Sequence, residues 1–131
     1  MTAPERLLVD TDILIHLLKK HPATVARFLQ LVDAGTRFLL SPVVVAEVYA
    51  GAFPREHKDV AALLHLFQRI DIDCDAGEAA GRYANQLAKA HNKISLEDYL
   101  LAASARQHRC PLWTGNRKHY PMTDITLFDP A

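Results

Sequence analysis

Two aspartates stand one residue apart at the end of an apolar stretch, and they are the strongest candidates for chemistry near the start of the chain. Asp10 and Asp12 follow a predicted strand over residues 5–9 and precede an apolar helical pattern. Ligands of open parallel sheets bind at the carboxyl ends of the strands, so both side chains are expected there. Asp12 is the better candidate for the N-cap of a helix over 13–20. That assignment leaves Asp10 as the aspartate available for a reaction.

Two further acids are expected at the same edge of the sheet. Glu47 is the one charged residue in the apolar helix predicted over 42–51, and Asp98 lies in the first turn of a helix predicted over 96–107. Each also has a structural explanation, because a lone acid on an apolar helix can extend to water and the helix dipole favours a carboxylate in the first turn. Glu97 is a similar residue that points about 100° away from Asp98.

A shared position for Asp10, Glu47 and Asp98 has a chemical consequence. Carboxylates held close together repel, and one or more of them takes up a proton unless a cation offsets the charge. A few oxygen ligands with open water positions suit Mg²⁺ or Mn²⁺. Such an ion can lower the pKa of a bound water and neutralise charge on a phosphoryl group. Thr11 and Thr114 are neutral oxygen donors that could orient these groups, as is Asn116, although all three are equally typical of turns.

Strands and helices alternate along the chain, and these elements must bring the three acids together. Apolar or alternating stretches predict strands over 5–9, 37–40, 70–73, 110–113 and, at an edge, 125–128. Helical spacing predicts helices over 13–20, 22–34, 42–51, 55–69, 75–91 and 96–107. The β-branched run in 43–51 favours a strand, but the Ser41-Pro42 start and the Gly51 stop favour a helix. We expect an α/β fold with a parallel sheet, in one domain over 1–131.

Composition narrows the function classes. The formal net charge of the 131 residues is zero, so any nucleic-acid binding must come from a local patch. Two cysteines make neither a disulfide framework nor a four-ligand zinc site. The residues after Met1 have no signal-peptide pattern, and no apolar run approaches the length of about 18 residues that a membrane span needs. We expect a cytoplasmic protein.

Four motifs carry a family resemblance. They are the apolar run that closes in Asp10-Thr11-Asp12, the segment 41–51 around Glu47, the segment 98–105 that begins at Asp98, and the segment 114–120. In this order and spacing they resemble the motifs of PIN-domain ribonucleases, especially the VapC-type toxins of bacterial toxin–antitoxin pairs. Each motif is loose alone, but together they span nearly the whole chain and are fairly specific.

The resemblance implies a three-layer α/β/α fold with a short, mostly parallel central sheet. It also implies a Mg²⁺-dependent (or Mn²⁺-dependent) endoribonuclease in which Asp10, Glu47 and Asp98 hold the metal and a metal-activated water attacks an RNA phosphodiester. Many family members carry a fourth acid near Asn116, so this neutral residue is assigned a supporting catalytic role. Asp12 replaces the commoner asparagine and is a hypothetical source of the missing charge.

The same resemblance implies contacts with other molecules. Arg117, Lys118 and His119 follow the site and could bind RNA backbone phosphates, although a solvated surface explains them equally well. Thr11, Thr114 and Asp12 are assigned supporting roles in the site. The expected partners are an RNA substrate, with tRNA among the candidates, a second copy of the chain, and a cognate VapB-like, DNA-binding antitoxin that covers the groove.

Other functions stay open on the sequence alone. A phosphohydrolase of the haloacid-dehalogenase kind would use Asp10 as a nucleophile, but Leu14 stands where that family has Thr or Val, and a cap domain is lacking. A receiver-type phosphoacceptor would need an aspartate after the third strand. Asp75 follows that strand, but it fits a helix cap as well. A catalytically inactive binding module with a PIN-like fold is the remaining alternative.

Overall fold

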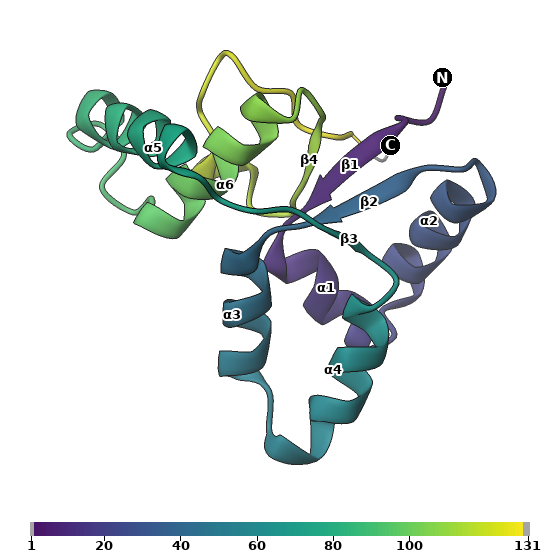
Figure 1. Ribbon diagram of the computed structural model, residues 1–131. Coiled ribbons are helices and arrows are strands. Elements are labelled where there is room, and N and C mark those ends of the chain that lie inside the picture. Colours follow the sequence, from purple (N-terminus) through teal and green to yellow (C-terminus); the bar gives the residue numbers. More distant parts are fainter. Residues whose placement is uncertain (1, 130–131) are drawn as a thin grey trace.

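The central feature of the computed structural model, which describes residues 2–129, is a sheet of parallel strands (Figure 1). Its strands are β1 (Arg6–Val9), β2 (Arg37–Leu40), β3 (Gln68–Arg69) and β4 (Leu112–Trp113), in the order β3-β2-β1-β4. Each neighbouring pair is parallel. The predicted α/β fold with a short parallel sheet is confirmed, and β1 lies between two other strands.

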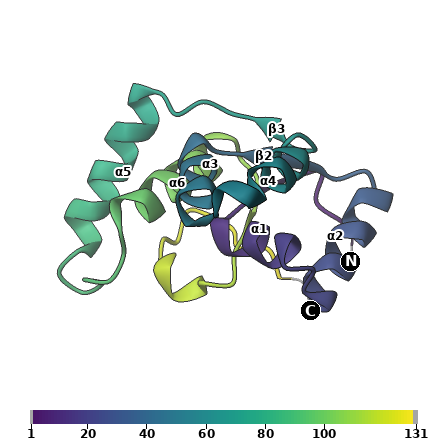
Figure 2. The same cartoon turned by 90° about the horizontal axis from the view of Figure 1, so that it is seen from below.

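The helices form two groups around this sheet (Figures 1 and 2). One contains α1 (Thr11–Leu18), α2 (Pro22–Asp33), α3 (Pro42–Gly51) and α4 (His57–Leu64), in which α1 contacts the other three. The other is the pair α5 (Cys74–Leu87) and α6 (Leu96–Gln107), packed along each other. Two 3₁₀ turns, η1 (Pro54–Glu56) and η2 (Arg117–His119), complete the elements. Within residues 2–129, no helix has both the length and the apolar character to cross a bilayer.

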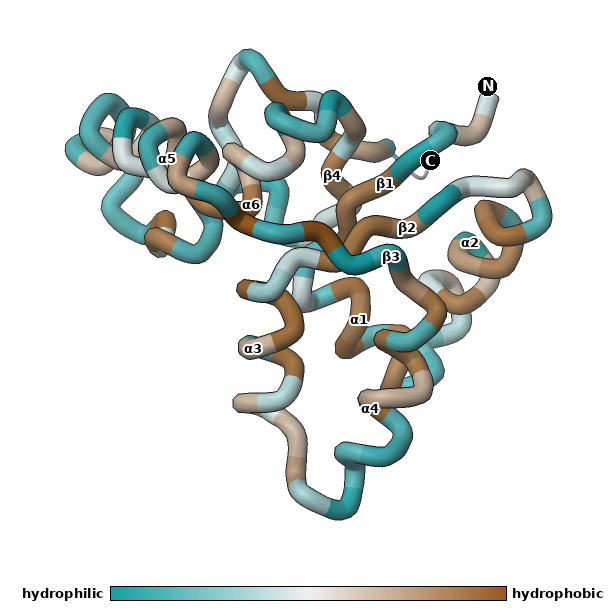
Figure 3. The backbone as a smooth tube through the Cα atoms, viewed as in Figure 1, coloured by the Kyte–Doolittle hydropathy of each residue, from teal (hydrophilic) through white to brown (hydrophobic). Residues whose placement is uncertain are grey.

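The core is built on β1, whose Leu7, Leu8 and Val9 are fully buried. Such near-continuous apolar strands are typical of parallel sheets covered on both faces, and each of these side chains contributes about 1.5–3 kcal/mol on burial. Figure 3 shows hydrophobic stretches in β1, β2 and β4 as well as in the helices, and the buried apolar residues of these strands belong to one core. Asp10, which follows Val9, therefore lies at the carboxyl end of the central strand, as the sequence predicted.

The start of α1 corrects one prediction. Asp10, not Asp12, is the N-cap, and its Oδ1 accepts a hydrogen bond from Thr11 N at 2.7 Å. Asp10 has extended backbone angles (φ −80°, ψ 162°) and Thr11 already begins the helix. The prediction was wrong because the strand passes into the helix at Asp10, two residues earlier than the apolar pattern indicated.

Two helices that carry expected site residues begin as predicted. Ser41 Oγ accepts from Val43 N at 3.2 Å, Pro42 opens α3, and the helical prediction for this β-branched segment is confirmed. Ser95 caps α6, whose bounds match the predicted 96–107. In both cases a hydroxyl satisfies a backbone N–H that the first turn leaves without a partner.

The middle and the end of the chain differ from the prediction. The helix expected over 55–69 ends at Leu64, and β3 lies two residues before the expected 70–73. Asp73, rather than Asp75, caps α5 by accepting from Ala76 N at 2.9 Å, and α5 ends at Leu87 instead of residue 91. Residues 125–128 form only an isolated bridge, Leu127 to Leu112, at the β4 edge. These short segments depend on tertiary pairing, which local patterns do not report.

Candidate active site

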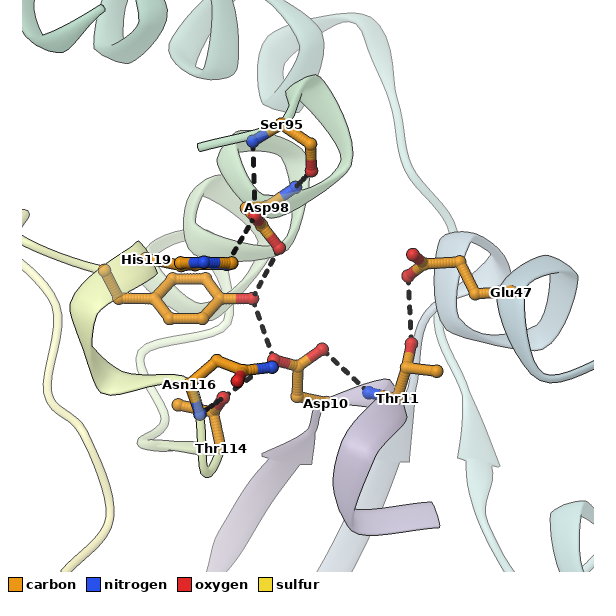
Figure 4. A network of polar contacts seen from close by, with 9 residues as sticks. Asp10, Thr11, Glu47, Ser95, Asp98, Thr114, Asn116 and His119 are labelled. Atoms are coloured by element: carbon orange, nitrogen blue, oxygen red, sulfur yellow. Dashed lines mark hydrogen bonds and ion pairs between the residues drawn. The ribbon is translucent and has the colours of Figure 1, made fainter. Parts of the chain in front are cut away.

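Asp10 is the centre of the site at the carboxyl end of β1. Its side chain is buried, with 5% of its surface exposed. Besides the bond from Thr11 N to Oδ1, its Oδ2 accepts from Thr114 Oγ1 at 2.8 Å and from Tyr120 Oη at 3.0 Å. Thr114 follows β4 and Tyr120 follows η2, so segments more than 100 residues away in the sequence hold this carboxylate. Figure 4 shows Asp10, Thr11 and Thr114 in this arrangement.

Asp98 approaches from α6 and is held by a capping box. Ser95 N donates to Asp98 Oδ2 at 3.2 Å, and Asp98 N donates to Ser95 Oγ at 3.2 Å. His119 Nδ1 lies 3.1 Å from the same Oδ2 (Figure 4). Asp98 Oδ1 accepts from Tyr120 Oη at 3.2 Å, so one hydroxyl reaches the carboxylates of both Asp10 and Asp98.

Glu47 faces the site from α3. Its side chain is exposed, and its Oε1 accepts from Thr11 Oγ1 at 2.9 Å (Figure 4). Thr11 thus connects Glu47 with Asp10 through its own hydroxyl and amide. Among residues 2–129, no three side chains of the His, Cys, Asp and Glu types lie close enough together to form a ready metal site. The structure brings Asp10 and Asp98 together at one hydroxyl, and Glu47 joins them through Thr11.

Asp12 has a structural contact that the sequence did not predict. Its Oδ2 accepts from Gly115 N at 2.7 Å and so fixes the loop between β4 and η2. A Cβ atom at Gly115 would lie 2.5 Å from that oxygen, so glycine permits the close approach of the backbone. Asp12 Oδ1 is buried without a hydrogen-bond partner.

The four residues after Gly115, which were predicted to assist catalysis or to bind RNA, have different contacts. The Asn116 side chain is exposed, and its backbone N donates to Thr114 Oγ1 at 3.0 Å. Arg117 Nη1 donates to Phe128 O at 3.3 Å and is therefore engaged with the C-terminal segment. Lys118 and His119 line a cleft of about 250 Å³ together with residues 90–94 of the loop between α5 and α6.

Burial and charge set the protonation behaviour of the site. Burial raises the pKa of Asp10 above its ordinary value, and the nearby Asp12 carboxylate adds to this, whereas hydrogen bonds from Thr114, Thr11 and Tyr120 oppose it. Burial and the charges of Asp10 and Asp98 also raise the pKa of Tyr120, so its hydroxyl keeps its proton and remains a donor.

The acids retain capacity for a further ligand. An ionised carboxylate offers about four lone-pair positions. The single proton of the Tyr120 hydroxyl is shared between Asp10 and Asp98. Apart from it, Asp10 has two donors, Asp98 has two including His119, and Glu47 has one. The set consists of oxygen atoms, as hard cations prefer. An ion at this position would offset the repulsion between the acids and the cost of burying Asp10 in its charged form.

Tyr120 and Ser95 are the site residues that sequence reasoning missed. Tyr120 closes the fourth motif directly after the basic residues 117–119, and nothing in this local pattern indicates a bond to Asp10 or Asp98. Ser95 directly precedes the helix predicted over 96–107, and its contact with Asp98 was not predicted. The capping-box spacing of Ser95 and Asp98 was a usable signal for that contact.

Comparison with known proteins identifies the family of the chain. A profile described as the PIN domain matches residues 7–123. Ribonuclease VapC10 of Mycobacterium tuberculosis is 34% identical over 118 residues, which cover 88% of this chain and 86% of the relative. Ribonuclease VapC19 of the same organism is 30% identical over 118 residues, covering 88% and 92%.

Solved structures agree with the fold. A toxin–antitoxin complex from Klebsiella pneumoniae matches with a TM-score of 0.70 and 26% identity, covering 95% of this chain and 98% of that chain. VapBC2 from Rickettsia felis, bound to a DNA fragment from its promoter, matches with a TM-score of 0.81 and 22% identity, covering 94% and 97%. The chain belongs to the PIN-domain family and, within it, to the VapC-type proteins.

Proposed function

We propose that the protein is a divalent-cation-dependent endoribonuclease and the toxin of a toxin–antitoxin pair. The observation that carries the proposal is the meeting of Asp10 and Asp98 at the Tyr120 hydroxyl, at the carboxyl end of the central strand. Relatives named ribonuclease VapC at 30–34% identity support the reaction class. Membership in the PIN family does not favour the phosphohydrolase and receiver alternatives.

The donor set fits Mg²⁺ or Mn²⁺, with Asp10, Asp98 and Glu47 as the residues that would hold the ion. When bound, such an ion supplies an activated water and offsets charge on the phosphoryl group. Thr114 donates to Asp10 and Ser95 donates to Asp98. Thr11 donates to both Asp10 and Glu47, so these three residues orient the acids. Glu47 is exposed and has one hydrogen bond, so its side chain can turn at little cost.

A basic cleft beside the carboxylates would bind the RNA backbone. We define it by His91, Lys93, Lys118 and His119, and no acidic residue lines it. His119, which lines the cleft, also contacts Asp98, so the cleft adjoins the acids. Phosphate contacts of this kind set the register of a strand without reading its bases. The engagement of Arg117 with Phe128 makes it the weakest of the three basic residues predicted to bind RNA.

The supporting residues have narrower proposed roles. Asn116 is exposed beside Thr114 and would orient water or phosphate oxygens at the edge of the site. Asp12 would act mainly by fixing Gly115, with its unpartnered Oδ1 as a secondary source of negative charge.

Partners follow from the relatives. The matching solved structures include VapBC and FitAB toxin–antitoxin systems. We infer that this chain forms a homodimer and binds a DNA-binding antitoxin. Copurification with the product of an adjacent short reading frame, followed by a mass measurement of the complex, tests both inferences.

The activity test compares wild type with Asp10→Asn on a mixed pool of RNAs, including tRNA, in Mg²⁺ or in EDTA. We expect cleavage only by wild type with Mg²⁺. Absence of this cleavage would count against the ribonuclease. Asp10-dependent release of phosphate from a small phosphomonoester would favour the phosphohydrolase instead.

A further inference from the structure

One hydroxyl stands between the two acids that the proposed reaction needs. Tyr120 is 3% exposed, and its Oη lies 3.0 Å from Asp10 Oδ2 and 3.2 Å from Asp98 Oδ1. Asp10 directly follows β1 and Asp98 lies in the first turn of α6, so Tyr120 links two elements that belong to different parts of the fold.

None of the other described donors of the site joins the two aspartates. Thr114 bonds Asp10, Ser95 bonds Asp98, and Thr11 contacts Asp10 through its amide and Glu47 through its hydroxyl. Tyr120 alone among the described donors contacts both aspartates. The spacing between Asp10 and Asp98 is therefore set by this one side chain more directly than by any other.

Packing does not explain the hydroxyl. A phenylalanine ring would fill the same apolar volume without burying a polar group, and burial of a hydroxyl is favourable only when it is bonded. The chain contains two useful comparisons. Tyr99, next to Asp98 on α6, has a buried hydroxyl without a partner, and Tyr83 Oη donates to Asp124 Oδ1 at 2.7 Å away from the site.

We propose that Tyr120 is a positioning residue whose hydroxyl holds Asp10 and Asp98 at the separation that a divalent cation requires. The inference rests on the proposed function, because it concerns the same acids. Groups that hydrogen-bond to metal-binding side chains typically change metal affinity by about 10–100-fold when they are removed. Tyr120 contacts two such side chains at once.

The test measures Mn²⁺ binding by isothermal titration calorimetry in the intact chain without RNA. Tyr120→Phe is expected to weaken Mn²⁺ affinity by about 10-fold or more. Tyr99→Phe and Tyr83→Phe, which also remove one buried or partly buried tyrosine hydroxyl, are expected to bind like wild type. Affinity in Tyr120→Phe within about twofold of wild type, or tighter, overturns the inference.

A second measurement needs no substitution. The chain has four tyrosines, and ¹³Cζ labelling reports the hydrogen bonding of each hydroxyl. Addition of Mg²⁺ is expected to shift the Tyr120 resonance and to leave those of Tyr83 and Tyr99 in place. An unchanged Tyr120 resonance at saturating Mg²⁺ contradicts the proposal.

The two levels of inference fail in different ways. If wild type binds no cation and cuts no RNA, the proposed function fails and the role of Tyr120 fails with it. If wild type binds Mn²⁺ and cleaves RNA but Tyr120→Phe binds equally well, only the role of Tyr120 is wrong.

Discussion

Asp10 combines two roles at the scale of one residue, because it caps α1 and it is the most deeply buried of the candidate acids. Its cap favours folding, whereas burial of its charge opposes folding. Proteins often retain such a cost at functional sites, since the same carboxylate that destabilises the empty site can bind a ligand. The opposition makes a prediction about pH.

Replacement of Asp10 by asparagine is expected to stabilise the cation-free protein at neutral pH by on the order of 1 kcal/mol, while removing cleavage. The amide preserves the acceptor for Thr11 N, and the hydroxyls of Thr114 and Tyr120 can turn to accept from its NH₂ group. Since burial raises the pKa of Asp10, the folded state holds its proton to higher pH than the unfolded state.

The sign of the pH dependence follows from this linkage. Wild type loses stability as pH rises from the unfolded pKa, about 3.9, through the raised folded pKa. The advantage of Asp10→Asn should therefore be largest above that window and disappear below it. Urea unfolding in EDTA across this range measures the difference, and an advantage that is independent of pH would contradict the burial argument.

At the scale of elements, the loop between β4 and η2 depends on the contact of Gly115 with Asp12. Gly115→Ala is expected to cost about 1 kcal/mol, because the new methyl group displaces Asp12 Oδ2 from its bond with Gly115 N. Urea unfolding of the single and double variants forms a cycle in which Asp12→Ala should remove most of this cost.

A matched glycine provides the control for that cycle. Gly77 lies in α5 with nothing within 4 Å of a Cβ atom placed there. Gly77→Ala is therefore expected to stabilise the protein by about 0.5–1 kcal/mol, as alanine does in helix interiors. An equal loss at both glycines, or a cost of Gly115→Ala that persists without Asp12, would show that the contact is not its cause.

The basic cleft is a second element-scale feature, since it joins the α5–α6 loop to η2. In an Asp10→Asn background, Lys93→Gln with Lys118→Gln should weaken binding of single-stranded RNA and reduce its salt slope by about 1.4, the value for two lost phosphate contacts. Fluorescence anisotropy across a salt series measures both quantities.

The control removes the same charge elsewhere. Lys19→Gln with Lys58→Gln changes two exposed lysines that do not line the cleft, so the net charge is the same as in the test variant. Equal losses of affinity in the two double variants would mean that general charge, rather than the cleft, binds RNA.

Features of the fold and the site could be predicted from the sequence where the residues that cause them lie close together in the chain. Ser95 and Asp98 lie three residues apart, so the start of α6 could be predicted from spacing alone. Tyr120 and Asp10 lie 110 residues apart, and no local pattern predicts that the Tyr120 hydroxyl lies between Asp10 and Asp98. The contact of Asp12 with Gly115 could not be predicted for the same reason, because it exists only after β4 has joined β1.

At the scale of the whole molecule, the candidate site spans both groups of helices. Asp98 comes from the α5–α6 pair and Glu47 from the α1–α4 group. Each is linked by hydrogen bonds to Asp10 at the end of β1, Asp98 through Tyr120 and Glu47 through Thr11. A cation held by these acids would connect parts of the fold that otherwise meet mainly through the sheet. The chain has no net charge, so such local interactions, rather than a global field, determine how it responds to ions.

Cation binding should therefore stabilise the entire fold. A ligand that binds only the folded state at about 100 times its Kd adds about 2.7 kcal/mol, which for a domain of this size corresponds to roughly 5–10 °C in Tm. We expect calorimetry to show this rise for wild type in Mn²⁺ over EDTA and no rise for Asp10→Asn. An ion bound nonspecifically to surface carboxylates would stabilise both proteins alike. An equal rise in the Tm of wild type and Asp10→Asn would therefore contradict cation binding at the proposed site.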